Sequence, residues 1–463
     1  MMLVKMEQKA MKKENRTLYE LNLSQEVVKL QCTYTLFKKV VNIITSVEVE
    51  KEIDFDLMQR AFNVAVERND CTRIRFVKKG KKLMQYFEPS VVYDNITRLE
   101  FKTKEEQDDF INGQTKRAIK YLKGEVLTPT FIKTYDNKYM LFFKVCHFIF
   151  DIYGLNFFIN DLFSVYDALS SGEPLPKEPK KFEDLLKKDL ETKYDAETKK
   201  AHYEYFSNLF ASNPEPYYAG FDGMTNKYVI KARSKNQRPV KMFFIKNDTK
   251  IYGHKIEKEQ VDKLNLFARE NNTTIASLLL YLYSVTQSRM NDDAEFLLPL
   301  ELCNVRDTLL SRKCAGTKVQ SLNVLTKVDK DLSFKQNLDF FVKEQGENYR
   351  HIGMSDMEHQ VLLHKIYKTS MMTTYYSLAY SFIPIETREG VKVNFYSNGK
   401  CALPCYTALL YDYKNSEIMV GYDCQIKLMS EQNVEKFHQN LIKCIDQALD
   451  NPDMLVKDIK LDK

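Results

Sequence analysis

The sequence has no run of apolar residues of the length, about 18 to 20, that a membrane-spanning helix requires. No apolar segment follows its first lysines, so the pattern of a secretory signal peptide is missing. The 9 cysteines are odd in number and show no paired zinc-ribbon spacing, which favours reduced thiols over a disulfide framework or a metal site. We therefore expect a cytoplasmic protein with no membrane span and no bound metal.

Several motifs and charge patterns are missing as well. The sequence contains no P-loop, no GxGxxG and no GxSxG, so nothing supports nucleotide use or serine-hydrolase chemistry. Its net charge is +6, and its lysines are scattered rather than gathered in one stripe, so nucleic acid is not an expected partner. Cys401 and Cys405 form an isolated CxxxC without the second pair that a metal site of this type needs.

The composition is that of an ordinary globular protein. Hydrophobic residues make up 44% of the 463 residues and charged residues 29%. This length favours more than one lobe. A basic tail is expected over residues 1–18, and the Pro-rich residues 171–179 form the clearest linker. We therefore predict an N-terminal lobe over residues 19–175 and a C-terminal lobe over residues 176–463.

One stretch, residues 139–154, carries the strongest signal for chemistry. Residues 140–146 have the apolar and β-branched character of a buried strand, whereas apolar residues recur at helical spacing over residues 155–170. His147 and Asp151 fall on the connection between the two. The strand would fix the backbone, the loop would expose the imidazole, and the carboxylate could turn inward and brace it.

The other periodic segments predict an α/β (α+β) protein with two-layer lobes. Helical periods cover residues 54–69, 105–122, 196–209, 257–270, 273–289, 333–350, 357–367 and 431–450. β-branched or alternating segments predict strands over residues 41–49, 73–77, 83–87, 126–135, 240–245, 250–256, 295–302, 375–384, 391–395, 408–413 and 417–423. A long surface loop is expected over residues 211–240.

The residues around the His-Asp pair resemble a known signature. Residues 146–152, CHFIFDI, resemble the HHxxxDG motif of condensation domains and of the wider chloramphenicol-acetyltransferase-like acyltransferases. Two positions depart from it. Cys146 stands in place of the first His, and Ile152 stands in place of the Gly, with a glycine arriving only at Gly154.

Three further segments resemble the same family, in the same order along the chain. Residues 68–76, RNDCTRIRF, are similar to its RHExLRTxF motif. Residues 303–306, CNVR, resemble the strand of that family that ends in a turn with Arg. Residues 315–323, AGTKVQSLN, resemble the segment that crosses between its lobes. The resemblance extends from about residue 20 to the C-terminus.

This resemblance implies both a fold and an activity. The implied fold has two chloramphenicol-acetyltransferase-like lobes arranged in a V around a central cleft and tunnel, with floor and latch crossovers from the C-terminal lobe. The implied activity is that of an acyltransferase. It would join an acyl thioester, carried on coenzyme A or on the phosphopantetheine of a carrier protein, to a small amine or alcohol acceptor. No tightly bound cofactor is implied, and the oligomeric state stays open.

By the same resemblance, His147 is the catalytic general base, because a neutral imidazole can take a proton from an attacking amine or hydroxyl. Asp151, the other member of the catalytic pair, is expected to fix the loop rather than transfer a proton. Its expected partner is Arg306, with Arg73 as the second choice, since an unpaired buried carboxylate would be strongly destabilising.

Ser381 is the candidate catalytic donor to the oxyanion, with Ser377 as an equal alternative. Cys146 and Ile152 are assigned to the substrate channel, although strand alternation points Cys146 away from the histidine and makes it a poor candidate nucleophile. Ile152 would narrow the route of the pantetheine arm. If Gly154 supplies the turn two residues late, Ile152 would instead point into the core.

Two alternatives remain open. On the residues alone, His147 could be a core histidine at the end of a strand. In functional terms, Cys146 and Ile152 would fit a degenerate, non-catalytic condensation-like domain that recruits a carrier protein or a partner enzyme. The retention of Asp151 and Arg306 beside the histidine favours the catalytic interpretation.

Overall fold

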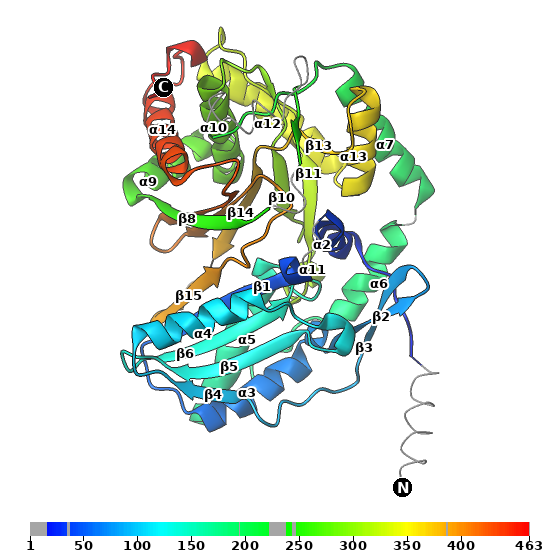
Figure 1. The fold of residues 1–463 in the computed structure, drawn as a ribbon, viewed down its shortest axis with the longest axis vertical. Helices are drawn as coiled ribbons and strands as arrows, with labels where there is room; N and C mark the ends of the chain where they lie inside the picture. Colours follow the sequence, from blue (N-terminus) through cyan, green and yellow to red (C-terminus); the bar gives the residue numbers. More distant parts are fainter. Residues whose placement is uncertain are drawn as a thin grey trace.

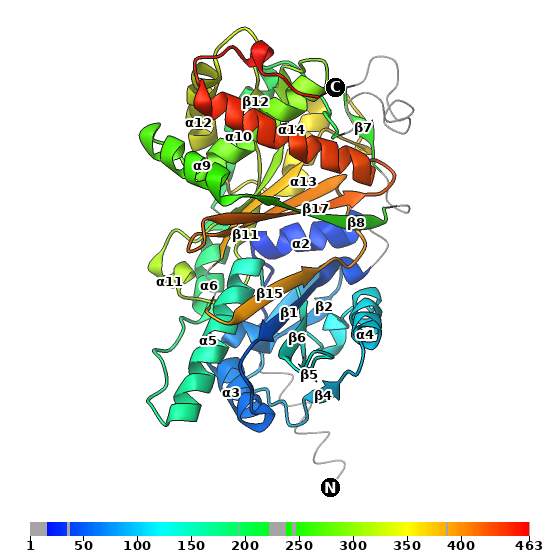
Figure 2. The same ribbon diagram turned by 90° about the vertical axis from the view of Figure 1, so that its left-hand side faces the viewer.

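The structure is a computed structural model that describes residues 16–34, 38–193, 195–221, 238–242, 247–385 and 388–462. Figure 1 shows two lobes, one above the other, each built around a sheet that helices cover. The first part of the chain forms most of the lower lobe, and the second part forms most of the upper one (Figures 1 and 2). The predicted α/β class is confirmed.

The N-terminal lobe contains a five-stranded sheet in the order β15-β1-β6-β5-β4. Helices α3 and α5 pack on one face of this sheet, and α4 packs on the other. The strands are β1 (Asn42–Val49), β4 (Thr97–Glu100), β5 (Leu127–Lys133), β6 (Tyr139–Cys146) and β15 (Val391–Tyr396). The helices are α3 (Phe55–Arg68), α4 (Lys104–Lys116) and α5 (Ile152–Ser171).

Strand β6 is central and buried on both faces. Leu141, Phe143 and Val145 enter the core under α3 and α5, whereas Met140 and Phe142 enter the smaller core under α4. Because neither face of the strand meets water, its sequence is apolar at successive positions, with Lys144 as the charged exception, rather than alternating. The strand predicted over residues 140–146 is thereby confirmed, and so is the helix that follows it.

Smaller elements complete this lobe. They are the helix α2 (Leu23–Tyr34), the hairpin of β2 (Ile74–Lys79) and β3 (Lys82–Phe87), and the short helices η1 (Lys38–Val41), η2 (Asp70–Arg73) and η3 (Tyr121–Lys123). Helix α2 also contacts β11 and α13 of the other lobe. It lies between the two lobes in both views (Figures 1 and 2).

Helix α6 (Phe182–Lys193) packs with the N-terminal lobe, so the boundary between the lobes lies after this helix. The linker composition places that boundary at residue 175, but Phe182, Leu185 and Leu186 of this helix are buried in the core of the N-terminal lobe. The core of the C-terminal lobe begins on the next helix, α7 (Ala196–Ala211). A Pro-rich sequence marks a turn, whereas core membership depends on which apolar faces meet in space.

The C-terminal lobe contains a six-stranded sheet in the order β11-β10-β14-β16-β17-β8. Its strands are β8 (Thr249–Ile256), β10 (Leu300–Asn304), β11 (Val319–Asn323), β14 (Ala379–Ile385), β16 (Cys405–Asp412) and β17 (Glu417–Gln425). Helices α9 (Lys258–Glu270), α10 (Ile275–Met290), α12 (Phe334–Arg350) and α14 (Glu431–Asp450) form the layer that shares its core. Every residue of α10 from Ser277 to Ser288 is buried, which explains why this stretch contains no charged residue.

The remaining described elements are short or peripheral. They are α11 (Leu309–Arg312), α13 (Asp356–Ile366), η4 (Val456–Asp458), β7 (Val240–Lys241), β9 (Phe296–Leu297), β12 (Thr326–Lys327) and β13 (Thr373–Thr374). The strand predicted over residues 295–302 is split into β9 and β10 on either side of Pro299, which has no N–H to donate to a ladder. Most of the loop predicted over residues 211–240 lies outside the described residues.

Two segments of the C-terminal half cross to the other lobe. Strand β15 pairs with β1 from Ile44 and Tyr396 to Val49 and Val391, so it completes the N-terminal sheet. The segment before β11 places Cys314 and Ala315 in the N-terminal core. In the described part of the chain, no helix has both the length and the apolar character that crossing a bilayer requires.

Candidate functional site

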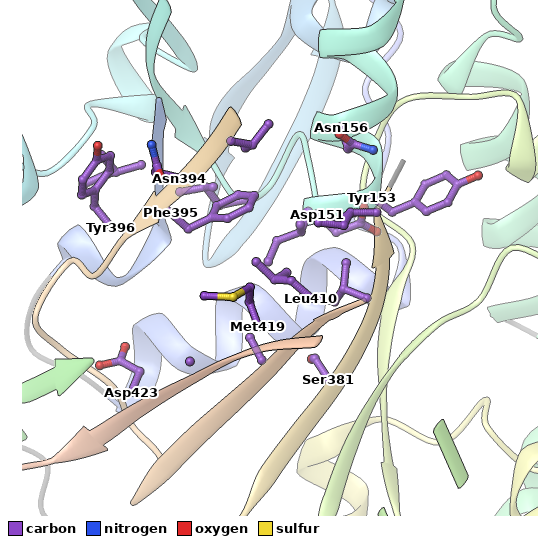
Figure 3. A pocket seen from close by; sticks show the side chains of 18 of the residues that line it. Asp151, Tyr153, Asn156, Ser381, Asn394, Phe395, Tyr396, Leu410, Met419 and Asp423 are labelled. Atoms are coloured by element: carbon purple, nitrogen blue, oxygen red, sulfur yellow. The ribbon is translucent and has the colours of Figure 1, made fainter. Parts of the chain in front are cut away.

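A cavity of about 1030 Å³ lies between the lobes. Its walls come from α2, α5 and β15 and from one face of β14, β16, β17 and β8. His147, Asp151, Ile152 and Ser381 all line it. Figure 3 shows Asp151 at the start of α5 on one side and Ser381 on the sheet below it. The fold therefore brings four of the predicted site residues, from both lobes, to one cavity.

The backbone around His147 fixes its ring. The His147 N–H donates to the carbonyl oxygen of Val41 at 2.7 Å, and the ring atom Nδ1 lies 2.8 Å from the carbonyl oxygen of Phe150. A carbonyl can only accept, so Nδ1 carries the hydrogen and Nε2 of the neutral ring carries the lone pair. Within the described residues, Nε2 has no hydrogen-bond partner. The one basic atom of the ring is left for a molecule in the cavity.

Burial sets the charge of this imidazole. Loss of water lowers the pKa of His147 below its ordinary value of 6.5, although its hydrogen bonds and the charge of Asp151 act in the opposite direction. The ring is therefore neutral at pH 7. A neutral ring with a free Nε2 is the form that can accept a proton.

Asp151 serves as a structural anchor at the start of α5. It is the N-cap of that helix and accepts from the N–H of Gly154 at 2.6 Å. It also accepts from the N–H of Lys318 at 2.7 Å and from Arg306 at 2.9 and 3.2 Å. The carboxylate is thus occupied by four donors, which matches the expected role of fixing the loop.

Arg306 is the partner that resemblance assigns to Asp151, and the structure pairs the two through both guanidinium nitrogens Nη1 and Nη2. Both side chains are buried, at 4% and 8% exposure. Arg306 also donates to the carbonyl oxygen of Gly316 at 2.5 Å and lies over the ring of Tyr153 at 4.5 Å. It therefore ties the crossing segment of one lobe to the loop of the other lobe that carries His147.

Arg73 does not support the site as predicted. Its guanidinium donates to the carbonyl oxygens of Val66, Glu67 and Glu88. These carbonyls lie at the end of α3 and after β3, so Arg73 stabilises that turn. The expectation that Arg73 supports the site is therefore wrong.

Gly154 permits a close approach between the lobes. A Cβ on Gly154 would lie 2.3 Å from the carbonyl oxygen of Gly316, well inside contact distance. Gly316 itself has a φ of 118°, and a Cβ there would lie 2.3 Å from the ring of Phe182. The two glycines let the crossing segment pass against the first turn of α5, where Arg306 and Lys318 reach the aspartate.

The two departures from the family motif have different positions. Ile152 is half-buried and lines the cavity. The channel assignment of Cys146 is wrong, because this residue is fully buried in the N-terminal core and does not line the cavity. Burial raises the pKa of the Cys146 thiol well above its ordinary value, so it is no nucleophile.

Ser381 and Ser377 differ in whether they line the cavity. Ser381 lines the cavity and shares a hydrogen bond with the Tyr406 hydroxyl. Ser377 accepts from Gln287 at 2.9 Å inside the C-terminal core. Ser381 is therefore the only one of the two that can reach a substrate in the cavity.

Other cavity residues have no counterpart in the sequence-based site. Val27, Val28 and Gln31 come from α2, and Asn394 and Tyr396 come from β15. Each lies far in sequence from the histidine, and only the crossing of β15 and the position of α2 bring them there. No local pattern in the sequence indicates such a placement.

A sequence model of the condensation domain matches residues 15–462. The chain belongs to the condensation-domain family. Relatives of this condensation domain include one plipastatin synthase subunit of Bacillus subtilis (strain 168), 19% identical over 430 residues, which are 91% of this chain and 16% of the relative. Tyrocidine synthase 3 of Brevibacillus parabrevis is 25% identical over 264 residues, 54% of this chain and 4% of the relative. The chain thus spans a small part of these relatives.

Solved condensation domains share the fold of this condensation domain. The starter condensation domain of rhizomide synthetase, a mutant in complex with C8-CoA and Leu-SNAC, has a TM-score of 0.79 at 13% identity and covers 96% of this chain and 98% of its own. The first condensation domain of the calcium-dependent antibiotic synthetase has a TM-score of 0.76 at 13% identity, covering 96% and 99%. At this identity, the likeness establishes the fold.

We expect Ile152→Gly to enlarge the cavity at a small stability cost. Because Ile152 lines the cavity and lies outside the buried core, the change should cost about 0.5 to 1 kcal/mol of backbone entropy. Turnover of bulky donors should rise. The matched control is Ile149→Gly, since Ile149 is fully buried and its loss should cost about 2 to 5 kcal/mol. Melting curves and a donor-length series measure both effects, and a large loss of stability for Ile152→Gly would contradict the channel position.

Proposed function

We propose that this condensation domain is an acyltransferase. It joins an acyl thioester, carried on coenzyme A or on the phosphopantetheine of a carrier protein, to an amine or alcohol acceptor. His147 is the general base. The observation that carries the proposal is the Nδ1 hydrogen bond to the carbonyl of Phe150, because it leaves Nε2 as a free acceptor in the cavity.

The proposed reaction needs one base and one hydrogen-bond donor. Nε2 of His147 takes the proton from the acceptor as its nitrogen or oxygen attacks the thioester carbonyl. The Ser381 hydroxyl is the candidate donor to the oxyanion that forms, a role worth about 3 kcal/mol where it has been measured. Collapse of the intermediate breaks the C–S bond, and the imidazolium returns the proton to the departing thiolate. The products are an amide or ester and a free thiol.

The partners follow from the same proposal. The solved relative that is named with C8-CoA and Leu-SNAC supports thioesters as ligands of this fold. Both lobes line the cavity, which supports the proposal that a donor and an acceptor meet between them. We propose coenzyme A or a carrier protein as the source of the donor, and a cytoplasmic location where both exist. The protein's own residues supply all of the proposed proton transfer.

The experiment that tests this function is a thioester turnover assay. The protein is incubated with a panel of acyl-CoAs and acyl-carrier proteins, with and without amines or alcohols, and free thiol and product are measured. We expect thiol release that depends on the acceptor. If the carriers bind but no thioester is turned over, the result supports the alternative of a non-catalytic domain that recruits a carrier protein.

The pH profile gives an independent prediction. Because burial lowers the pKa of His147 below 6.5, the base stays deprotonated as the pH falls through 6.5 and is protonated only below that value. We expect kcat/KM to be flat near pH 7 and to fall on the acid side with a midpoint below 6.5. A midpoint above 6.5 would contradict this geometry for the base.

A further inference from the structure

The sheet face that lines the cavity carries a row of small side chains. Ser381, Ala408, Gly421 and Gly253 are register partners on four neighbouring strands, β14, β16, β17 and β8. All four line the cavity. With strands about 4.8 Å apart, the row extends for about 14 Å across the sheet. It forms the floor of a groove.

Neither glycine of this floor is required by the fold. Gly253 and Gly421 have no positive φ. A Cβ on Gly253 would meet no heavy atom within 4 Å, and one on Gly421 would meet only Ile251 at 3.9 Å and the Ala408 carbonyl at 4.0 Å. Glycine weakens a strand, and its presence inside one often marks the close approach of a ligand. There is therefore room for a side chain at both positions, and the sequence has none there.

Apolar side chains form the walls of the groove. Leu410 and Met419 pair with each other on one side of the floor, two residues from Ala408 and Gly421. Ile251 lies on the other side, two residues from Gly253. Met419 is 49% exposed and Ile251 is 37% exposed. Apolar side chains that face an open cavity rather than a core mark a binding surface. A glycine floor with apolar side chains on both sides can accept an extended chain.

Asp423 places a carboxylate at one end of this groove (Figure 3). It lies on β17, pairs with Tyr406 of β16 on one side and with Ile251 of β8 on the other, and lines the cavity. Figure 3 shows its carboxylate at the end of the cavity away from Asp151. Its oxygens accept from the Ser397 hydroxyl at 3.2 and 3.3 Å, and the Thr249 hydroxyl also bonds to it.

The carboxylate of Asp423 has hydroxyl partners but no counter-charge. Across the described residues, no lysine, arginine or histidine is paired with it. Burial raises the pKa of Asp423, and only its hydroxyl partners oppose that shift. A half-buried carboxylate that has no cation beside it can pair with a cationic hydrogen-bond donor from a ligand in the cavity.

From these observations we infer that the groove is a subsite for an unbranched aliphatic chain that ends in an amine, with the chain over the Gly421 floor and the ammonium group on Asp423. The inference rests on the proposed function, since it names a class of substrate for the same cavity. The chain could belong to the acyl donor or to the amine acceptor, and the chemistry that the groove recognises is the same for both.

Binding measurements test this subsite without any turnover. The donor arm compares 8-aminooctanoyl-pantetheine with nonanoyl-pantetheine, and the acceptor arm compares 1,8-diaminooctane with nonylamine. Each pair differs by an ammonium in place of a methyl group. In isothermal titration calorimetry at pH 7, we expect the ammonium-ended probe to bind more tightly in one arm, which identifies the source of the chain.

Asp423→Asn should remove that preference. The amide keeps the size of the side chain and loses its charge, so the ratio between the two probes should fall by roughly 10- to 100-fold, the range for a hydrogen bond between charged groups. The matched control is Asp331→Asn in the same lobe, because the Asp331 carboxylate is already paired with Lys457 at 3.0 Å and does not line the cavity. That control should leave the ratio unchanged.

Gly421→Val tests the floor of the groove. Valine favours a strand, and its Cβ would lie at ordinary contact distance from Ile251 and the Ala408 carbonyl, so the melting temperature should not fall. Binding of both long probes should weaken by at least about tenfold, while acetyl-pantetheine and ethylamine bind as before. The inference is overturned if Asp423→Asn keeps the preference, if neither arm shows one, or if Gly421→Val binds the long probes normally. A failure of thioester turnover would instead count against the proposed function alone.

Discussion

His147→Ala should lower acyl transfer by about 10²- to 10⁴-fold, the usual contribution of a positioned general base. Its Nε2 is the free basic atom of the ring, and the hydrogen bond of Nδ1 to the Phe150 carbonyl holds the ring in place. The variant should still fold, because the ring lines the cavity and its removal costs one hydrogen bond of about 1 kcal/mol. Turnover and melting temperature, measured on the same preparation, separate these two effects.

The control for this variant is His202→Ala. Burial also lowers the pKa of His202, but its ring lies near His351 on the outer part of the C-terminal lobe, away from the cavity. Its loss should leave turnover unchanged. Wild-type turnover in His147→Ala, on a substrate pair that the protein is known to use, would remove this histidine from the mechanism.

The local part of the site could be predicted from the sequence. Strand β6, the loop and helix α5 are continuous in the chain, so the apolar run and the helical period place the His and the Asp at their junction. The same alternation correctly points Cys146 away from His147. Treating Cys146 as a channel residue gave the family motif more weight than this alternation, and the buried position of the thiol shows that the alternation was the better guide.

The long-range part of the site could not be derived from pattern. Arg306 lies 155 residues from Asp151, and only the family resemblance suggested the pair. The close contact of Gly154 with Gly316 and the pairing of β15 with β1 have no local signal at all, because they depend on how two lobes cross. A signal did exist for the groove, since glycines within strands are unusual enough to be noticed in the sequence.

Arg306→Met should destabilise the protein and disable the site together. Methionine keeps much of the length of the side chain but removes the charge, and it leaves the Asp151 carboxylate, 8% exposed, without a counter-charge. Breaking a buried pair from one side costs about 3 to 5 kcal/mol. Turnover of the folded fraction should also fall, because the loop that carries the Phe150 carbonyl, and with it the orientation of the His147 ring, loses its anchor to the crossing segment.

Arg68→Met provides the matched control for this prediction. Arg68 and Asp161 form a second buried pair, at 3.0 Å with side chains 6% and 8% exposed, and both residues lie within the N-terminal lobe on α3 and α5. Its loss should lower the melting temperature by a similar amount, because the physical cause is the same. It should not change turnover at a temperature where circular dichroism shows both variants folded. Equal turnover in the two variants would mean that the Arg306 pair stabilises the fold without positioning the base.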